Sequence, residues 1–490
     1  MVAKTFQGLE AVLADELRAL GAEDVTPGKR MVSFRGDLAL LYKANMCCRT
    51  ALRILKPFLK FDASDADTLY AKVKAFDWST LLRVDQTFAI DTVTNSNEFK
   101  HSQFVTYRVK DAIVDWFRDH DENERRPSVR LDGADIMINV HISERHVTLS
   151  LDSSGESLHR RGWRSAQTDA PINEVLAAGI ILMTGWKGDT PFVDPMCGSG
   201  TFAIEAAMIA AGINPGVYRK HFAFETWPDF DADLLQEIYN DDSGEREVTC
   251  PILAADILPR AIDIARENAK SAGIDRYITF ETKSIASWQS APQPAGVLVT
   301  NPPYGKRISV DDMAALYKTI GTVLKHVFTG YTAWIIGYND EYFGEIGLAP
   351  SQKIAVNNGG LDCELREYVM FAGNKKSFRA SGGRIKDLNS NGRPDRKKRA
   401  DAGDRRERRP FDRNKKGAFD RKDKFAGRDR AERPARKDER TAKPQEGRRP
   451  FRLGGKPTMP SISPDKEIVI NRPAWRTRKK HDDNTENTDK

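Results

Sequence analysis

Apolar residues over positions 1–374 recur at spacings that predict alternating helices and strands. Helical spacing is found over residues 9–20, 42–55, 69–76, 102–118, 171–184, 202–211, 259–272 and 316–328. Short apolar or alternating runs predict strands over residues 31–34, 87–93, 135–140, 146–151, 252–256, 277–282, 296–300, 332–337 and 365–371. In the helix over 102–118, the side chains expected to face the core are Phe104, Val105, Val109, Ile113 and Phe117. The pattern predicts an α/β chain whose second half forms a mostly parallel, doubly wound sheet.

A strand that begins at Phe192 leads into a glycine-rich turn and then a helix. The stretch reads Asp194-Pro195-Met196-Cys197-Gly198-Ser199-Gly200-Thr201, and an apolar helical run follows it. Strand, glycine-rich turn and helix in this order form a unit whose backbone can approach a nucleotide closely. No Gly-Lys-Ser or Gly-Lys-Thr follows, so this is not the phosphate loop of ATPases.

The apolar strand over 296–300 ends in Asn301-Pro302-Pro303-Tyr304. The two prolines stiffen the loop and remove two N–H donors, which leaves outward carbonyl acceptors. Asn301 adds a side-chain acceptor and Tyr304 a flat ring. Acceptors can hold an exocyclic amine while a ring stacks on the base, although the loop could also be a simple turn at a sheet edge.

Together the two motifs resemble class I methyltransferases that use S-adenosylmethionine (SAM) and modify exocyclic amines of bases. Residues 107–115, 126–129 and 151–164 resemble the THUMP domain, an RNA-binding module, and its connection to a catalytic domain. Residues 1 to about 375 are similar to the THUMP-containing RNA guanine-N2 methyltransferases, with the bacterial 23S ribosomal RNA large-subunit methyltransferase K/L group nearest, in its N-terminal methyltransferase half.

The resemblance implies a Rossmann-like methyltransferase domain preceded by an α+β RNA-binding region and followed by a disordered basic tail. The expected divisions are a ferredoxin-like subdomain over 1–54, the THUMP domain over 55–155, the methyltransferase domain over 156–374 and the tail over 375–490. Catalytic roles are expected for Asn301, Pro302, Pro303 and Tyr304. The residues expected to bind SAM are Asp194, Cys197, Gly198, Ser199, Gly200, Thr201, Asp256, Ile257, Ser284 and Asn301.

Two of these assignments leave alternatives open. Asp256 ends a strand, where a carboxylate can accept from ribose hydroxyls, which is the favoured role; it could also cap the helix that begins at Pro259, and the two roles can coexist. Ser284 stands where many SAM enzymes carry an aspartate that accepts from the adenine amino group. Serine can still accept a hydrogen bond, but without charge.

Basic residues suggest where RNA would bind. Arg108 and Lys110 lie on the THUMP-like helix, and Arg160, Arg161 and Arg164 surround Trp163 just before the catalytic domain. Arginine binds phosphate in a bidentate manner, and tryptophan can stack on a base. The alternative for the second group is an interdomain hinge whose tryptophan packs in a core.

The net charge of +7 divides unevenly along the chain. Residues 375–490 contain 38 Lys and Arg against 19 Asp and Glu, whereas residues 1–374 contain the remaining 39 and 51. The tail has few branched apolar residues, so it is expected to stay unfolded and to attract RNA, or else to act as a solvated linker. The five cysteines show no metal-binding spacing, and no signal peptide or membrane span is apparent, which favours a reduced, cytoplasmic, metal-free protein.

The expected function is SAM-dependent methylation of the N2 amine of a guanine, in 23S ribosomal RNA or a large-subunit precursor. One alternative is N6-adenine methylation of RNA or DNA, because the same loop chemistry serves both amines. Another is an RNA-binding ribosome-assembly factor without catalysis. Cytosine-C5 methylation would need a cysteine nucleophile beside the base, and none lies in or next to the Asn301 loop.

Overall fold

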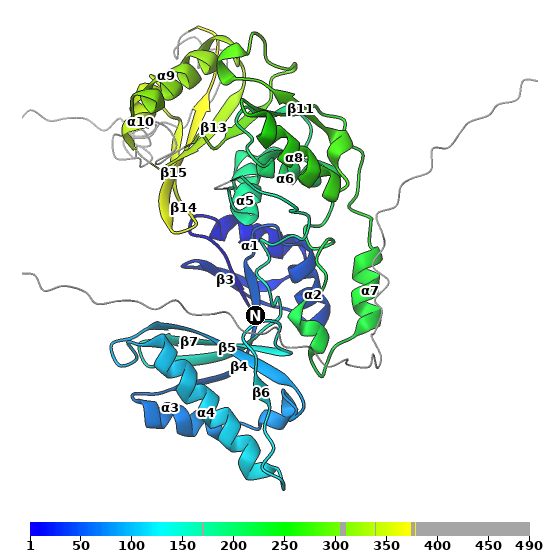
Figure 1. The fold of residues 1–490 in the computed structure, drawn as a ribbon, viewed down its shortest axis with the longest axis vertical. Helices are drawn as coiled ribbons and strands as arrows, with labels where there is room; N and C mark the ends of the chain where they lie inside the picture. The colour runs from blue at the N-terminus through cyan, green and yellow to red at the C-terminus, as the bar shows by residue number, and fades with distance from the viewer. Residues whose placement is uncertain (169–170, 304–309, 339, 374–377, 379–490) are drawn as a thin grey trace, which may run out of the picture. The chain divides into compact units, whose positions relative to one another are not determined.

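The computed structural model describes residues 1–168, 171–303, 310–338, 340–373 and 378 (Figure 1). Tyr304 and the basic tail after residue 378 lie outside the described residues. The helices are α1 (Glu10–Ala19), α2 (Leu38–Cys47), α3 (Ala66–Lys74), α4 (Ser102–His120), α5 (Glu174–Thr184), α6 (Thr201–Ala211), α7 (Ala232–Asn240), α8 (Pro259–Ser271), α9 (Val310–His326) and α10 (Asp340–Glu345). Among the described residues, no helix is both long enough and apolar enough to cross a membrane.

The first sheet contains eight of the described strands, in the order β2-β3-β1-β4-β8-β7-β5-β6. They are β1 (Val2–Lys4), β2 (Glu23–Gly28), β3 (Met31–Arg35), β4 (Arg53–Asp62), β5 (Thr87–Asn95), β6 (Ser128–Val129), β7 (Ile136–Ser143) and β8 (His146–Asp152). Strand β4 pairs with β1 on one side and with β8 on the other. The predicted division at residue 54 therefore falls inside a strand that both halves of the sheet share.

The predicted helix over 42–55 is wrong in its second half. Helix α2 ends at Cys47, and β4 begins at Arg53. Ile54 lies opposite Ala3, and Leu55 lies opposite Asp152. Pairing with strands far away in the sequence overrides the local helical pattern here.

Helices α3 and α4 lie side by side against the sheet that carries β5 and β7 (Figure 1). The predicted inward face of α4 is confirmed for Val105, Val109, Ile113 and Phe117, all of which are buried. Phe104 is the exception, because 55% of its surface is exposed.

The second sheet has the order β11-β10-β9-β12-β13-β15-β14, which confirms the predicted Rossmann-like fold. Its strands are β9 (Phe192–Asp194), β10 (Ile252–Asp256), β11 (Ile278–Thr282), β12 (Val297–Thr300), β13 (Thr332–Gly337), β14 (Gln352–Asn358) and β15 (Leu361–Val369). Strands β9 to β13 are parallel, and β15 is antiparallel to β13. The chain moves outward from β9 to β10 and β11, and then returns to β12 on the other side of β9. In such sheets ligands bind beyond the carboxyl ends of the strands where the order reverses, here β9 and β12.

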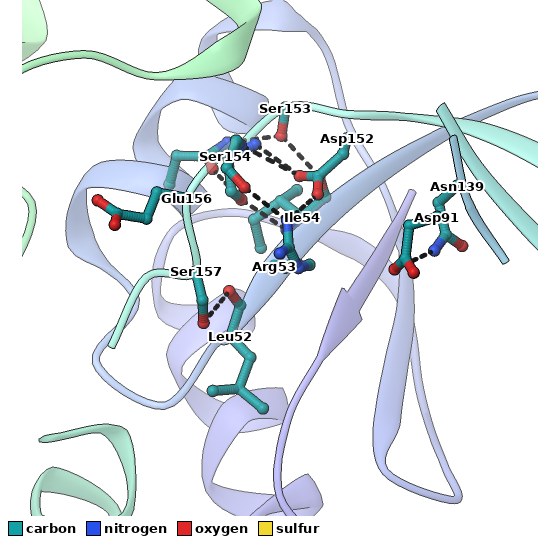
Figure 2. A network of polar contacts seen from close by, with 12 residues as sticks. Leu52, Arg53, Ile54, Asp91, Asn139, Asp152, Ser153, Ser154, Glu156 and Ser157 are labelled. Atoms are coloured by element: carbon teal, nitrogen blue, oxygen red, sulfur yellow. Dashed lines mark hydrogen bonds and ion pairs between the residues drawn. The ribbon is translucent and has the colours of Figure 1, made fainter. Parts of the chain in front are cut away.

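Buried hydrogen bonds fix the segment after β8 to the first sheet (Figure 2). The Ser153 hydroxyl donates to the Ile54 carbonyl at 2.8 Å, and the Ile54 N–H donates to the Ser154 hydroxyl at 2.9 Å. Asp152 accepts from the N–H groups of Ser154, at 2.9 Å, and Gly155, at 3.3 Å. The segment that leads to the second sheet therefore leaves the first in a defined direction.

Candidate active site

A pocket of about 970 Å³ opens at the carboxyl edge of the second sheet. Its walls come from the turns that follow four adjacent strands. These are residues 194–199 after β9, 256–258 after β10, 284–285 after β11 and 301–303 after β12. Segments more than 100 residues apart in sequence thus meet where the strand order reverses, as the parallel-sheet rule predicts.

Two glycines give the turn after β9 its shape. Gly198 has φ of +52° and Gly200 has φ of +83°, a region that other residues rarely adopt. A Cβ atom on Gly200 would lie 2.9 Å from the Cβ of Ala265 in α8. Gly200 therefore permits α6 to pack against α8, while Gly198 and Ser199 line the pocket.

Asp256 accepts two backbone hydrogen bonds, one from the glycine-rich turn and one from the residue before α8. One of its oxygens accepts from the Gly198 N–H at 3.0 Å, and the other accepts from the Leu258 N–H at 2.9 Å just before α8. A carboxylate has about four acceptor positions, so the group can still receive hydroxyl donors from a ligand. Beside it, Ile257 is 66% exposed, an apolar surface that a flat ring can cover.

The side-chain oxygen of Asn301 is buried, and it accepts no hydrogen bond from the described residues. This Oδ1 is shielded from solvent, and no donor among the described residues lies within hydrogen-bond distance. The register of β12 against β9, with Leu298 opposite Val193, places the Asn301 loop beside the turn that follows Asp194. A buried polar atom without a partner costs free energy, so this oxygen is suited to a donor from a ligand.

Two further groups that line the pocket have pKa values raised by burial, which favours their uncharged forms. Burial raises the pKa of the Cys197 thiol well above its usual value, and the nearby carboxylates of Asp194 and Asp256 raise it further. Burial likewise raises the pKa of Asp194 well above its usual range. Within the described ranges, no cluster of three His, Cys, Asp or Glu could hold a metal ion.

Comparison with known families gives three matches along the chain. The ferredoxin-like domain model of the large-subunit methyltransferase L matches residues 1–55, the THUMP domain model matches residues 63–152, and the RMKL-like methyltransferase domain model matches residues 161–367. A putative RNA methyltransferase of Synechocystis is 41% identical over 368 residues, which cover 74% of this chain and 95% of that protein. The chain belongs to the THUMP-containing RNA methyltransferases.

Other relatives agree with that assignment. A ribosomal RNA large subunit methyltransferase K/L of Syntrophotalea carbinolica is 39% identical over 376 residues, but this chain spans only 52% of it. A putative methyltransferase solved with S-adenosylhomocysteine (SAH) is 30% identical with a TM-score of 0.68, over 76% of this chain and 98% of that one. A Listeria monocytogenes protein described as a predicted N6-adenine-specific DNA methylase is 32% identical with a TM-score of 0.68, over 75% and 95%. As a member of this family, the chain is a SAM-dependent RNA methyltransferase.

The structure corrects the RNA-binding assignment of Arg161 in this methyltransferase. Its side chain is only 2% exposed and pairs with the fully buried Glu205 of α6 at 3.1 Å. Its other nitrogens donate to the carbonyls of Leu158, at 3.1 Å, and Arg49, at 2.6 Å. Arg161 therefore links Glu205 of α6 to the carbonyl of Arg49, which lies between α2 and β4. It is buried there, and RNA cannot reach it.

We expect Arg161→Met to lower the free energy of unfolding by about 3–5 kcal/mol, because it leaves Glu205 as a buried charge without its partner. Arg160→Met is the matched control, since that arginine is 66% exposed and pairs only with Glu156. An exposed pair contributes about 1 kcal/mol or less. Urea unfolding of both variants measures the difference, and equal midpoints would contradict the internal role of Arg161.

Arg164, another predicted RNA ligand, makes hydrogen bonds within the protein, and its contact with RNA stays a prediction. Its guanidinium donates to Glu174 at 2.6 Å, Ser199 at 3.0 Å and Thr201 at 2.9 Å, all inside the methyltransferase domain. Neighbouring Trp163 is 1% exposed, so the alternative of a hinge with its tryptophan in a core is the one observed.

The other basic residues stay predictions for RNA. Arg160 is exposed beside Glu156. Arg108 donates to Asp67 at 2.6 Å and lies 4.4 Å from the ring centre of Tyr70. Lys110 pairs with Asp111 at 2.6 Å. Each would exchange a carboxylate for a phosphate on binding RNA.

The sequence analysis missed Asn268 of α8, which is fully buried. Its amide nitrogen donates to the carbonyls of Ala166, at 2.9 Å, and Ser199, at 3.0 Å, and its oxygen accepts from the Ser165 N–H at 2.9 Å. It thereby joins the incoming segment to the glycine-rich turn. The available signal was its position seven residues after Ala261, on the apolar face of the helix.

Ser284 and Asn173 have local roles in the structure. The Ser284 hydroxyl accepts from the Ala286 N–H at 3.3 Å and lines the pocket. Asn173 caps α5 by accepting from the Val175 N–H at 3.0 Å. Neither observation tests a direct contact with the cofactor.

Proposed function

We propose that this protein transfers the methyl group of SAM to the N2 amine of a guanine in 23S ribosomal RNA. The observation that carries the proposal is Asn301, which lines the pocket and whose buried Oδ1 has no donor among the described residues. The similarity to a large-subunit methyltransferase K/L supports the choice of RNA and base.

The pocket has the residues that SAM requires. The turn of residues 194–201 would hold its amino-acid end, Asp256 its ribose hydroxyls, and Ile257 and Ser284 its adenine. SAM, when bound, supplies a methyl group on a sulfonium that needs no further activation. The open Asp256 acceptor positions, the exposed Ile257 surface and the glycine turn all suit such a nucleoside ligand.

The Asn301 loop would prepare the nucleophile. An exocyclic amine is weakly nucleophilic because its lone pair is delocalised into the ring. Asn301 Oδ1 and the Pro302 carbonyl can each accept one N–H, which directs the lone pair toward the methyl carbon. Neither Pro302 nor Pro303 has an N–H, so neither can donate to these acceptors. The nitrogen becomes acidic as the new bond forms, and its proton can leave to solvent without a strong base. Positioning lowers most of the barrier.

The base itself is the part of the proposal that rests on family. The same two acceptors would hold the N6 amine of adenine, and the Listeria relative is described as an N6-adenine-specific methylase of DNA. Stacking of the base on Tyr304 belongs to the proposal and concerns a residue outside those described. RNA contacts by Arg108, Lys110, Arg160 and the basic tail, and a cytoplasmic location, are likewise predictions.

Identification of the labelled nucleoside tests the proposal. The purified protein is incubated with tritiated SAM and deproteinised 23S RNA, with 16S RNA as the control, and the RNA is digested. Label in N2-methylguanosine from 23S RNA alone is the expected result. Label in N6-methyladenosine would overturn the base while keeping the reaction. Absence of label with both naked RNA and precursor particles, despite SAH binding, would favour the assembly-factor alternative.

A further inference from the structure

Arg164, in the segment that joins the two sheets, forms hydrogen bonds with residues of the glycine-rich turn. Arg164 does not line the pocket, but Ser199 and Thr201, which do, both accept hydrogen bonds from it. These two residues flank Gly200, at the point where the turn becomes α6. The third partner of Arg164 is Glu174, the first residue of α5, whose side chain is only 7% exposed.

The guanidinium therefore holds three acceptors, one from α5, one from the glycine-rich turn and one from α6. Glu174 balances its charge at 2.6 Å, so the group carries little net charge toward the pocket. Arginine is suited to this geometry because its donors form a rigid fork, whereas a lysine ammonium is a single flexible point. The arrangement fixes the hydroxyls of Ser199 and Thr201 in one orientation.

The turn needs such support. Both of its glycines have positive φ, and glycine loses more conformational freedom on ordering than any other residue. When a ligand must order a mobile turn, the conformational entropy lost by the turn weakens binding. A turn that is already ordered before binding avoids this cost. Asn268 holds the carbonyl of Ser199 from the opposite side at 3.0 Å.

The position of Arg164 is itself fixed from upstream. Arg161 is buried against Glu205, and Arg219 donates to the carbonyls of Glu156, at 2.7 Å, and Arg160, at 2.8 Å. Gly162 has φ of +106°, and a Cβ there would lie 2.3 Å from the Tyr218 carbonyl oxygen. The chain has little room to shift between these anchors and Arg164.

We propose that Arg164 is a positioning residue that organises the glycine-rich turn for SAM, so that the segment joining the two sheets sets cofactor affinity. This rests on the proposed placement of SAM at that turn. Arg164 acts through Ser199 and Thr201 and not by contact with the cofactor. Its role differs from that of Arg161, which stabilises the fold and touches no pocket residue.

Isothermal titration of the full-length protein with SAH tests the inference. Arg164→Met keeps the length of the side chain but removes its donors, and we expect the Kd for SAH to rise about tenfold. The Kd of Arg164→Lys for SAH should lie between the values of Arg164→Met and the wild type. Arg246→Met is the matched control. Arg246 donates to the carbonyls of Ala210 at 2.6 Å and Ile209 at 3.1 Å, at the C-terminal end of α6, whereas Arg164 binds its N-terminal end. The Kd of this control for SAH should stay within twofold of the wild-type value.

Two milder variants, Arg164→Lys and Glu174→Gln, keep the test informative if Arg164→Met folds poorly. Glu174→Gln retains an acceptor but loses the charge, and we expect it to raise the Kd about threefold, with an effect that vanishes when Arg164 is already methionine. An unchanged Kd in Arg164→Lys and Glu174→Gln, or an equal rise in Arg246→Met, would overturn the inference. Failure of the wild type to bind SAH would instead contradict the proposed cofactor site.

Discussion

Replacing Asn301 by alanine is expected to slow single-turnover methyl transfer about a thousandfold while the Kd for SAH stays within about threefold. Loss of one oriented hydrogen-bond partner at a reacting centre costs about 100- to 1000-fold in rate, and here the lost acceptor orients the nucleophile itself. Its Oδ1 is buried and has no donor among the described residues, so the change breaks no described hydrogen bond to that oxygen. Rapid-quench measurement with enzyme in excess over RNA isolates the transfer step.

Two companions make the result specific to the acceptor. Asn301→Asp keeps oxygen acceptors and should retain more activity than the alanine variant. Asn357→Ala is the control, because Asn357 lies in β14 and its side chain donates to the exposed Asp362 at 3.2 Å. A rate for Asn301→Ala within tenfold of the wild type would show that this oxygen does not hold the amine.

Replacing Asp256 by alanine is expected to raise the Kd for SAH about a hundredfold. Two hydrogen bonds from ribose hydroxyls to a carboxylate would each contribute about 1.5 kcal/mol, and about 1.4 kcal/mol corresponds to a factor of ten. The change also frees the N–H of Gly198, which Asp256 holds at 3.0 Å, so the glycine-rich turn should loosen. Isothermal titration with SAH measures the effect.

The same variant separates the two roles of Asp256. Its other oxygen accepts from the Leu258 N–H at 2.9 Å, and loss of such a hydrogen bond costs about 1 kcal/mol of stability. Asp263→Ala, at an exposed position of α8, is the matched control and should change neither affinity nor stability. A lowered Tm with an unchanged Kd would mean that Asp256 only stabilises the turn before α8.

The residues that local pattern could predict were those whose role depends on a short stretch of chain. The glycine-rich turn and the Asn301 loop each follow a short apolar strand, and the parallel-sheet rule was enough to place both at one edge. The structure brings them together around one pocket. Strand order, with its reversal between β9 and β12, confirms the Rossmann-like expectation.

The errors arose where a partner lies far away in the sequence. Arg161 was predicted to contact RNA because a cluster of arginines in the sequence does not show which residues they pair with. Arg161 is paired with Glu205, 44 residues later, and is buried by that pairing. Helix propensity over 42–55 failed for the same reason, since β4 is stabilised by pairing with β8, near residue 150. Asn268 was missed because its partners, Ala166 and Ser199, lie 102 and 69 residues away.

A crystal structure of the full-length protein with SAH would show whether the cofactor binds between Asp256, Ile257 and Asn301. The account predicts the ribose hydroxyls within hydrogen-bond distance of Asp256, the adenine against Ile257, and the sulfur directed toward Asn301 Oδ1. SAH bound away from these three residues, or Asn301 Oδ1 occupied by another donor of the protein, would contradict it.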